Sequence, residues 1–458
     1  MNKPEYLQRR LLVAGALLTL SFTVLKAQEI PDSARQTILE VGQRLEWSDN
    51  PELDEVGEDR FTSRTTLQYS GFRRASNDTL SFSLGGDLEL TDGGADADDG
   101  LTNTNLGLGW DRNVRRSRTG LSFNYLESDL GSTTGTFFNE DTSSIDFGTV
   151  DRGSRETIDF RLDGAFGIDS PIGGSYDVWQ RLIDYSDTED EDLRDAERLT
   201  LSGDLFFVLN PRFTVGLDGL YRDFDEDGPD DLDTTDIRID TFADVIFSQT
   251  LSGRFALGWE EVEESGTTNN TENGVVFDAS LTQAMPRSDV TVGLGTDIVA
   301  SGRRSEVRFG QSFDLPRNTL SYSLGLSRVE GEGTEPLLGL GWSQDLPRGA
   351  LRALVEQTPA TNSDNDNLIN SRVVVGYTQE LTPRSGFDLE FSFIDSSNRT
   401  IDDDDSQRLD IDLTYRHEVY RDWDLISGVS LVRLDEDGDD DRDANTIFIG
   451  LEKTFVWN

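Results

Sequence analysis

Charged side chains recur at every second position in many segments of this chain, as in Asp159, Arg161 and Asp163. Carboxylates and guanidinium groups spaced in this way can set the electric field of a water-filled passage, and an excess of carboxylates favours cations. Arginine can also hold the hydroxyls or carboxylates of a solute. The same groups could instead pair with one another and only stiffen a wall. The candidate lining residues are Arg64, Asp87, Glu89, Asp159, Arg161, Asp163, Arg238, Asp240, Asp244, Glu306, Arg308, Arg352, Arg372, Asp410, Asp412 and Arg416.

Two acidic segments space their carboxylates at alternate positions beside a glycine. Such oxygen ligands suit Ca²⁺, although neither segment has the glutamate that ends an EF-hand loop. Calcium is therefore an expected candidate ligand and not a required cofactor. The alternatives are diffuse binding of divalent cations beside lipopolysaccharide, or plain solvation of the charge. The candidate metal ligands are Asp223, Asp225, Asp227, Asp435, Asp437 and Asp439.

Residues for catalysis are scarce. The chain has no cysteine and a single histidine, His417. That histidine shares its alternate register with Leu413 and Tyr415, so it should lie on the apolar face of a strand. The sequence holds no Gly-x-Ser-x-Gly turn and no cluster of zinc ligands. We therefore expect that the protein is not an enzyme, although no pair among its many aspartates can be singled out or dismissed.

Apolar residues alternate with polar ones over segments of about ten residues, which is typical of strands with one apolar face and one polar face. The clearest case runs from Leu80 through Phe82, Leu84 and Leu88 to Leu90. Only 35% of the 458 residues are hydrophobic, too few for a bundle of membrane-spanning helices. The pattern predicts an all-β, antiparallel, up-and-down transmembrane barrel of about 22 strands, with 18 or 20 as alternatives. A soluble β-sandwich is a weaker alternative.

The connections between these runs are of two alternating kinds. One kind is acidic and often long, as in residues 127–155 and 223–236, whereas the other is short and contains arginine or proline, as in residues 286–288 and 252–254. A barrel with both chain ends on one side collects its tight turns there. Only residues 301–305 are short and basic where a long loop is due. If residues 127–155 folded into the lumen, they would favour a gated pore or a scaffold.

The N-terminus predicts export. Arg9 and Arg10 precede an apolar stretch that ends near Ala27, as in a secretory signal peptide, although a membrane anchor is an alternative. We expect a signal peptide at 1–27, a short periplasmic segment at 28–36 and a single barrel domain at 37–458. The formal net charge of −47 repels nucleic acid, so no such partner is expected.

The last segment carries the family resemblance. Ile449, Leu451, Phe455 and Trp457 look like the aromatic-ended final strand of Gram-negative outer-membrane β-barrel proteins of the porin type. The resemblance implies that Phe455 and Trp457 signal to the barrel assembly machinery, although Lys453 interrupts the apolar face. It also implies contact with outer-membrane lipid and lipopolysaccharide, and passive diffusion of small hydrophilic solutes or cations. Other candidates are a surface barrel that acts as an adhesin or envelope scaffold, and the outer-membrane pore of a polysaccharide or secretion export system.

Overall fold

The computed structural model describes most of the chain after residue 32. The described residues are 33–51, 53, 57, 59–93, 100–130, 136–139, 144–147, 153–186, 188, 193–227, 232–266, 269–299, 301–331, 333–361, 367–398, 406–436 and 442–457. The expected signal peptide at 1–27 lies outside them. No helix in this part of the chain is long and apolar enough to cross a membrane.

Strands make up nearly all of the described residues. They are β1 (Ser33–Ser48), β2 (Arg60–Ala75), β3 (Asp78–Asp92), β4 (Gly100–Val114), β5 (Ser117–Asp129), β6 (Thr136–Asn139), β7 (Ser144–Phe147), β8 (Ser154–Phe166), β9 (Ile172–Ser186), β10 (Ala196–Asn210), β11 (Phe213–Glu226), β12 (Leu232–Ile246), β13 (Leu251–Ser265), β14 (Asn270–Met285), β15 (Ser288–Val299), β16 (Gly302–Leu315), β17 (Asn318–Val329), β18 (Thr334–Leu346), β19 (Gly349–Thr361), β20 (Asn367–Thr382), β21 (Ser385–Asn398), β22 (Ser406–Tyr420), β23 (Trp423–Glu436) and β24 (Arg442–Trp457).

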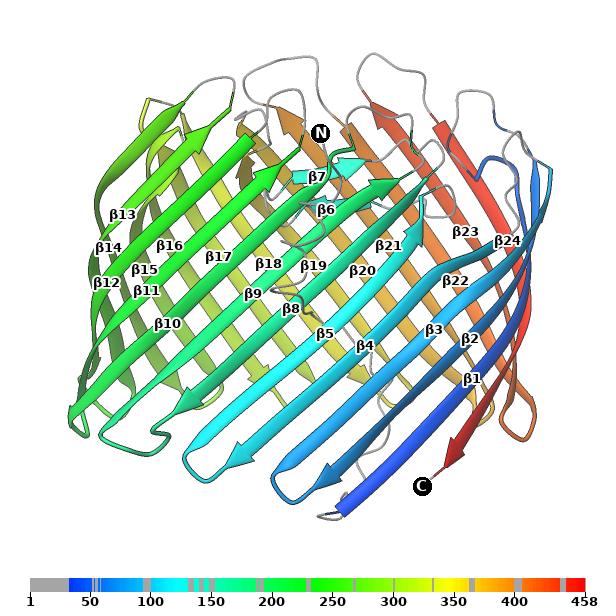
Figure 1. The fold of residues 1–458 in the computed structure, drawn as a ribbon, viewed down its shortest axis with the longest axis horizontal. Helices are drawn as coiled ribbons and strands as arrows, with labels where there is room; N and C mark the ends of the chain where they lie inside the picture. The colour runs from blue at the N-terminus through cyan, green and yellow to red at the C-terminus, as the bar shows by residue number, and fades with distance from the viewer. Residues whose placement is uncertain are drawn as a thin grey trace, which may run out of the picture.

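The long strands form one closed antiparallel barrel of 22 strands (Figure 1), as the alternation predicted. Each pairs with its neighbour in the chain, except that β5 pairs with β8 because β6 and β7 form a separate two-stranded sheet. The first and last strands, β1 and β24, pair with each other and close the ring. Their paired residues run from Thr37 opposite Trp457 to Ser48 opposite Thr446. Closure leaves the barrel itself without a free first or last strand.

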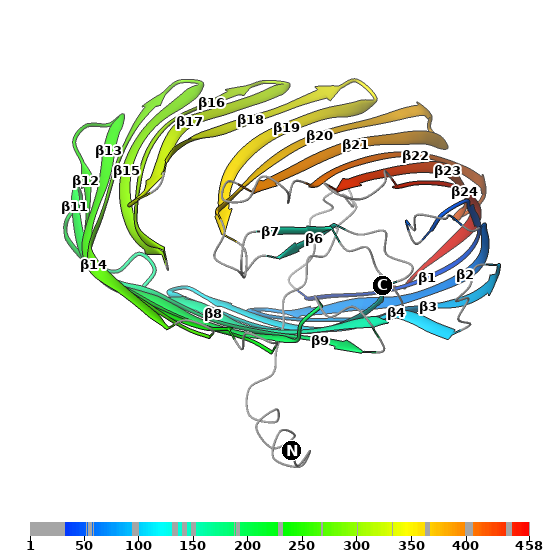
Figure 2. The same cartoon turned by 90° about the horizontal axis from the view of Figure 1, so that it is seen from above.

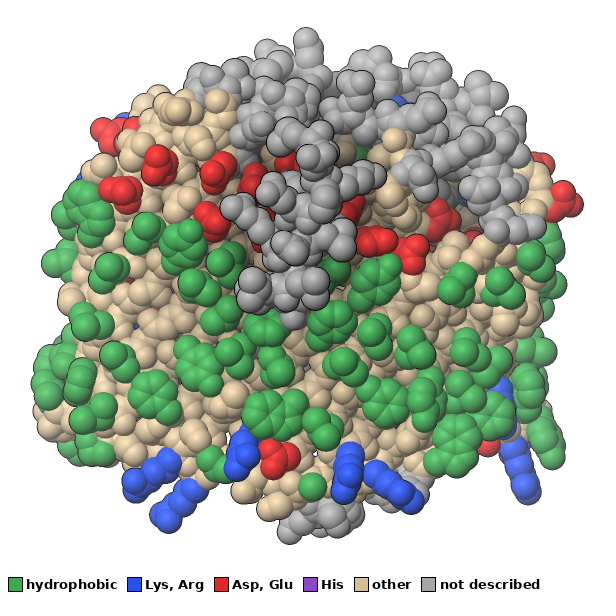
Figure 3. Space-filling view, viewed as in Figure 1, with side chains coloured by type: hydrophobic (Ala, Val, Ile, Leu, Met, Phe, Trp, Pro, Cys, Tyr) green, Lys and Arg blue, Asp and Glu red, His purple; other side chains and the backbone are tan. Residues whose placement is uncertain are grey.

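The wall has two chemically distinct faces. Leu84 and Leu88 point outward and remain 55% and 50% exposed, and a band of such side chains covers the middle of the surface in Figure 3. On the same strand, the adjacent residues Ser83 and Glu89 point inward and are only 5% and 4% exposed. Alternation along each strand therefore places an apolar surface outside and a polar one inside.

The tight turns gather at one end of the barrel, which we call the turn end, and the longer connections at the other, the loop end (Figure 1). The turn predicted at 252–254 is wrong, because β13 already begins at Leu251. The connection before it closes on Ser248, whose Oγ accepts hydrogen bonds from the backbone N–H groups of Thr250 and Leu251 at 3.2 and 3.0 Å. A serine therefore replaces the proline or arginine that other turns use.

Candidate functional site

The structure places all the predicted lining residues on the inner face of the barrel, and most of them in ion pairs. Arg64 is representative: its Nε lies 2.6 Å from Glu89 on β3 and 3.9 Å from Asp87. The register aligns Arg64 with Glu89 directly, so the pair follows from strand pairing. Further pairs join Asp163 to Arg118, Arg308 to Glu306, Asp410 to Arg408 and Arg416 to Glu452.

A denser cluster spans β8 and β9. Asp159 accepts from Arg181 Nε at 2.9 Å and from Trp179 Nε1 at 3.2 Å, and Arg161 Nε lies 2.6 Å from Asp177. The sequence did not identify Arg181 and Asp177 as lining residues, because Val178 and Trp179 are both apolar and leave the register of β9 ambiguous. Trp179 turns inward, where its ring lies under Arg181 with 4.9 Å between the guanidinium carbon and the ring centroid.

The most extensive network crosses β12, β13, β15 and β16, and we call it the β12–β16 network. Arg238 Nε lies 2.6 Å from Asp240 on its own strand, and Arg238 Nη1 lies 3.8 Å from Glu260 on β13. Arg304 Nε donates to Asp297 at 3.2 Å. The network also includes Glu306, 3.9 Å from Arg304. Glu260 was not predicted, although its inward register was readable; Arg304 was expected in a connection.

Glu260 also fastens the end of the β15–β16 hairpin to the inner wall. Its Oε2 accepts from the backbone N–H of Ile298 at 2.7 Å. Pairing between β14 and β15 stops at Phe277 with Thr296, and beyond that point Ile298 packs on Val262 and Val276 of β13 and β14. The hairpin end has therefore left the wall and lies over the inner face of its neighbours.

Gly274 on β14 permits this close approach. A Cβ at Gly274 would lie 2.6 Å from Arg303 Nη2 and 3.5 Å from Ile298 Cδ1. The hairpin end thus narrows the lumen on this side. A second element inside the ring is the β6–β7 sheet, which comes from residues 127–155 and lies beside β20 (Figure 2).

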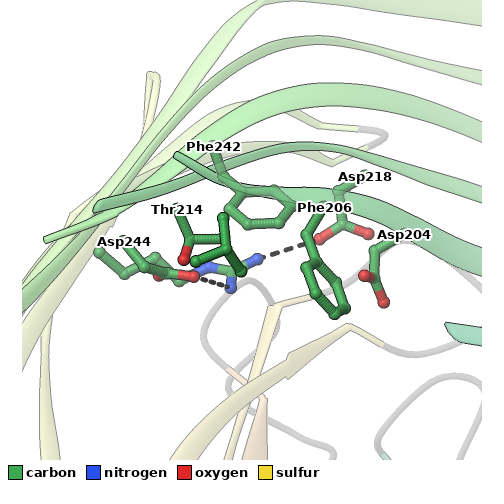
Figure 4. Close-up of a pocket in the computed structure, with 8 residues that line it drawn as sticks. Asp204, Phe206, Thr214, Asp218, Phe242 and Asp244 are labelled. Atoms are coloured by element: carbon green, nitrogen blue, oxygen red, sulfur yellow. Dashed lines mark hydrogen bonds and ion pairs between the residues drawn. The ribbon is translucent and has the colours of Figure 1, made fainter. Parts of the chain in front are cut away.

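A recess of about 320 Å³ opens in the wall between β10 and β13 (Figure 4). Arg254 lies 3.3 Å from Asp218 and 3.5 Å from Asp244, and its guanidinium carbon lies 4.1 Å from the ring centroid of Phe242. Phe242 in turn covers Gly216, where an added Cβ would overlap the ring. The positive charge of Arg254 is therefore neutralised by two carboxylates of the wall itself.

A larger recess of about 640 Å³ lies between β19 and β22, and we call it the β19–β22 recess. Arg352 and Arg372 line one side, and Asp388, Glu390 and Asp412 line the other. Among the residues that the structure describes, none of these five has an ion-pair partner within 4.0 Å. Small residues such as Gly376 separate the two sides. This part of the wall holds both signs of charge open to water.

The calcium hypothesis stays a prediction. Asp437 and Asp439 lie outside the described residues. Asp223, Asp225, Asp227 and Asp435 are described, yet within the described part of the chain no three carboxylates come together as a metal site. Asp223 instead accepts a hydrogen bond from Thr235 Oγ1 at 3.1 Å.

The final strand keeps its apolar outward face despite Lys453. Phe455 and Trp457 stack outward with 6.0 Å between their ring centroids. Lys453 bends back toward the turn end, where its Nζ donates to the carbonyl of Arg421 at 2.8 Å and lies 3.3 Å from Asp422. The lysine thus carries its charge away from the apolar band. The role of this strand in assembly remains a prediction.

Comparison with known proteins finds the fold but no family. No family model matches the chain, and no curated protein does. Three solved structures resemble it: the siderophore receptor PiuA from Acinetobacter baumannii (TM-score 0.59, 10% identity, 93% of this chain and 82% of that chain), the FrpB iron transporter from Neisseria meningitidis (0.56, 9%, 93% and 82%) and the ferric-catecholate import receptor Fiu from E. coli K12 in its open form (0.55, 10%, 94% and 82%). At such low identity the likeness shows the barrel fold alone.

Proposed function

We propose that this chain is an outer-membrane barrel of a Gram-negative bacterium that passes small hydrophilic solutes through its lumen, with a preference for cations. The two-faced closed wall supports this proposal most strongly. An apolar outer band suits lipid, a charged inner face suits water, and closure lets adjacent strands satisfy most of one another's backbone hydrogen bonds without solvent. The loop end would then face outward and the turn end the periplasm, after removal of residues 1–27.

The β19–β22 recess supports selectivity in the lumen. Arginines paired within the wall present little net field, because a carboxylate lies against each of them. The unpaired charges of the recess can act on a permeating solute. They belong to Arg352, Arg372, Asp388 and Glu390. Carboxylates outnumber basic side chains in the whole chain, whose formal charge is −47, and this excess favours the passage of cations.

A second candidate is a gated importer, and the β6–β7 sheet inside the ring favours it. The similar structures are described as iron and siderophore receptors or transporters, and this chain could share a gated route with them. Such a protein would conduct poorly until the lumen was cleared.

Planar-bilayer recording of the refolded mature chain tests both candidates. A channel gives stable ohmic steps, with a reversal potential in a salt gradient on the cation side. Closed wild-type protein that conducts after deletion of residues 136–147 would favour the gated importer. Absence of steps from both proteins, in samples whose gel mobility is heat-modifiable as for a folded barrel, would refute transport. Equal cation and anion permeability would remove the selectivity.

A further inference from the structure

The turn end carries a ring of arginines that the lumen does not use. All are exposed, and none forms an ion pair with another residue in the described ranges. In Figure 3 blue side chains project along the lower edge, below the green apolar band. We call this set the arginine collar: Arg74, Arg115, Arg116, Arg212, Arg287, Arg317, Arg348, Arg384 and Arg421.

The backbone holds the collar in place while leaving its side chains free. Proline precedes many of these arginines, as at Pro347, and presets the turn. The carbonyl of the turn arginine then accepts a hydrogen bond from the neighbouring hairpin. The bonds run from Asp314 N to Arg287 O at 3.0 Å, Asp345 N to Arg317 O at 2.8 Å, Glu380 N to Arg348 O at 2.7 Å and Glu418 N to Arg384 O at 2.7 Å.

Among the described residues, no carboxylate at the same end forms an ion pair with a collar arginine; Asp422, for example, pairs with Lys453. Asp314, Asp345 and Glu380 occupy inward positions of their strands, opposite in register to the outward Phe313, Gln344 and Gln379. They therefore line the mouth of the lumen, and within the described residues none of them pairs with a collar arginine. The collar presents unneutralised positive charge from a protein that is strongly acidic overall.

The position of the collar indicates its partner. One guanidinium group can donate two parallel hydrogen bonds to two oxygens of a phosphate. Lipid headgroups begin at the edge of an apolar band. The collar follows the turns from β2 round to β22, so its partner must surround the barrel. Lipids do so, whereas a single protein would touch one side. We propose that the arginine collar binds the anionic phospholipid headgroups of the leaflet at the turn end; this inference rests on the membrane location proposed above.

Two double variants on the same strands make a matched test. R348Q/R384Q removes two collar arginines from the turns that flank β19 and β20. R352Q/R372Q removes two arginines from the lumen side of those strands, with the same change in charge. The full mature chain is reconstituted in vesicles of phosphatidylcholine with a minority of phosphatidylglycerol. Spin-labelled analogues of both lipids measure their relative occupancy around the barrel, and heat-modifiable mobility verifies folding.

The wild type should prefer phosphatidylglycerol, and the preference should decline with salt. Loss of one arginine should lower local partition roughly fivefold, so R348Q/R384Q should lose most of its preference at those turns and R352Q/R372Q should keep it. Equal occupancy of both lipids around wild type, or an unchanged preference in R348Q/R384Q, would overturn the proposal. A folded protein that prefers anionic lipid but never conducts would refute only the transport function, whereas failure to insert would refute the membrane location.

Discussion

The β12–β16 network and the β19–β22 recess are built from the same residue types on the same inner face, yet they use charge in opposite ways. In the network, Glu260 is 4% exposed and contacts both an arginine and a backbone N–H group. In the recess, Glu390 shares the wall with two arginines and pairs with neither. Buried pairs fix structure, because each group depends on its partner for lost hydration. Exposed charges cost little to leave unpaired and remain available to solutes.

The largest expected difference is in stability. E260A removes the acceptor for Ile298 and leaves Arg238 without one of its carboxylates, so it should lower the free energy of unfolding by about 3 kcal/mol. E390A should change it by less than about 0.5 kcal/mol, since no described contact is lost. Urea unfolding in detergent or lipid vesicles, followed by tryptophan fluorescence, measures both. Equal losses in the two variants would erase the distinction between the regions.

Glycines offer a second contrast, between the recess around Arg254 and the β19–β22 recess. G216A would push its Cβ into the Phe242 ring that supports Arg254, and such overpacking should cost about 1 to 3 kcal/mol. A Cβ added at Gly376 in the recess would meet no atom within 4 Å, so G376A should be neutral or stabilise by about 0.5 kcal/mol. The same unfolding assay checks both, and a destabilised G376A would show that the recess is packed more tightly than the structure indicates.

Ion selectivity should change most with substitutions in the β19–β22 recess. One unit charge about 5 Å from a permeating ion in water changes its energy by roughly 0.8 kcal/mol, or about fourfold. R352Q/R372Q should therefore raise the cation-to-anion permeability ratio severalfold, and D388N/E390Q should lower it. R238Q should move the reversal potential less, because two carboxylates already screen Arg238. A larger shift from R238Q than from the recess variants would contradict this assignment.

The sequence predicted the ring of strands well, because alternation along each strand is a local property. It also predicted the inward position of residues such as Arg64 and Arg372. It could not predict which charges pair, since that depends on the register between strands. Arg254 and Arg304 were expected in connections, and both lie inside strands facing the lumen. The departure of the β15–β16 hairpin from the wall depends on contacts of Ile298 with β13 and β14, which have no local signature.

Salt provides the smallest but most discriminating effect. The Debye length falls from about 10 Å at 0.1 M to about 3 Å at 1 M salt, so fields that cross water are screened whereas buried contacts are not. The permeability change caused by R352Q/R372Q should therefore shrink toward zero at 1 M KCl, while the stability loss caused by E260A should persist. Recording both variants across one salt series separates open charge from structural charge in a single wall. Persistence of the R352Q/R372Q effect at high salt would mean that these arginines shape the recess sterically, and the contrast between the two regions would then rest on packing alone.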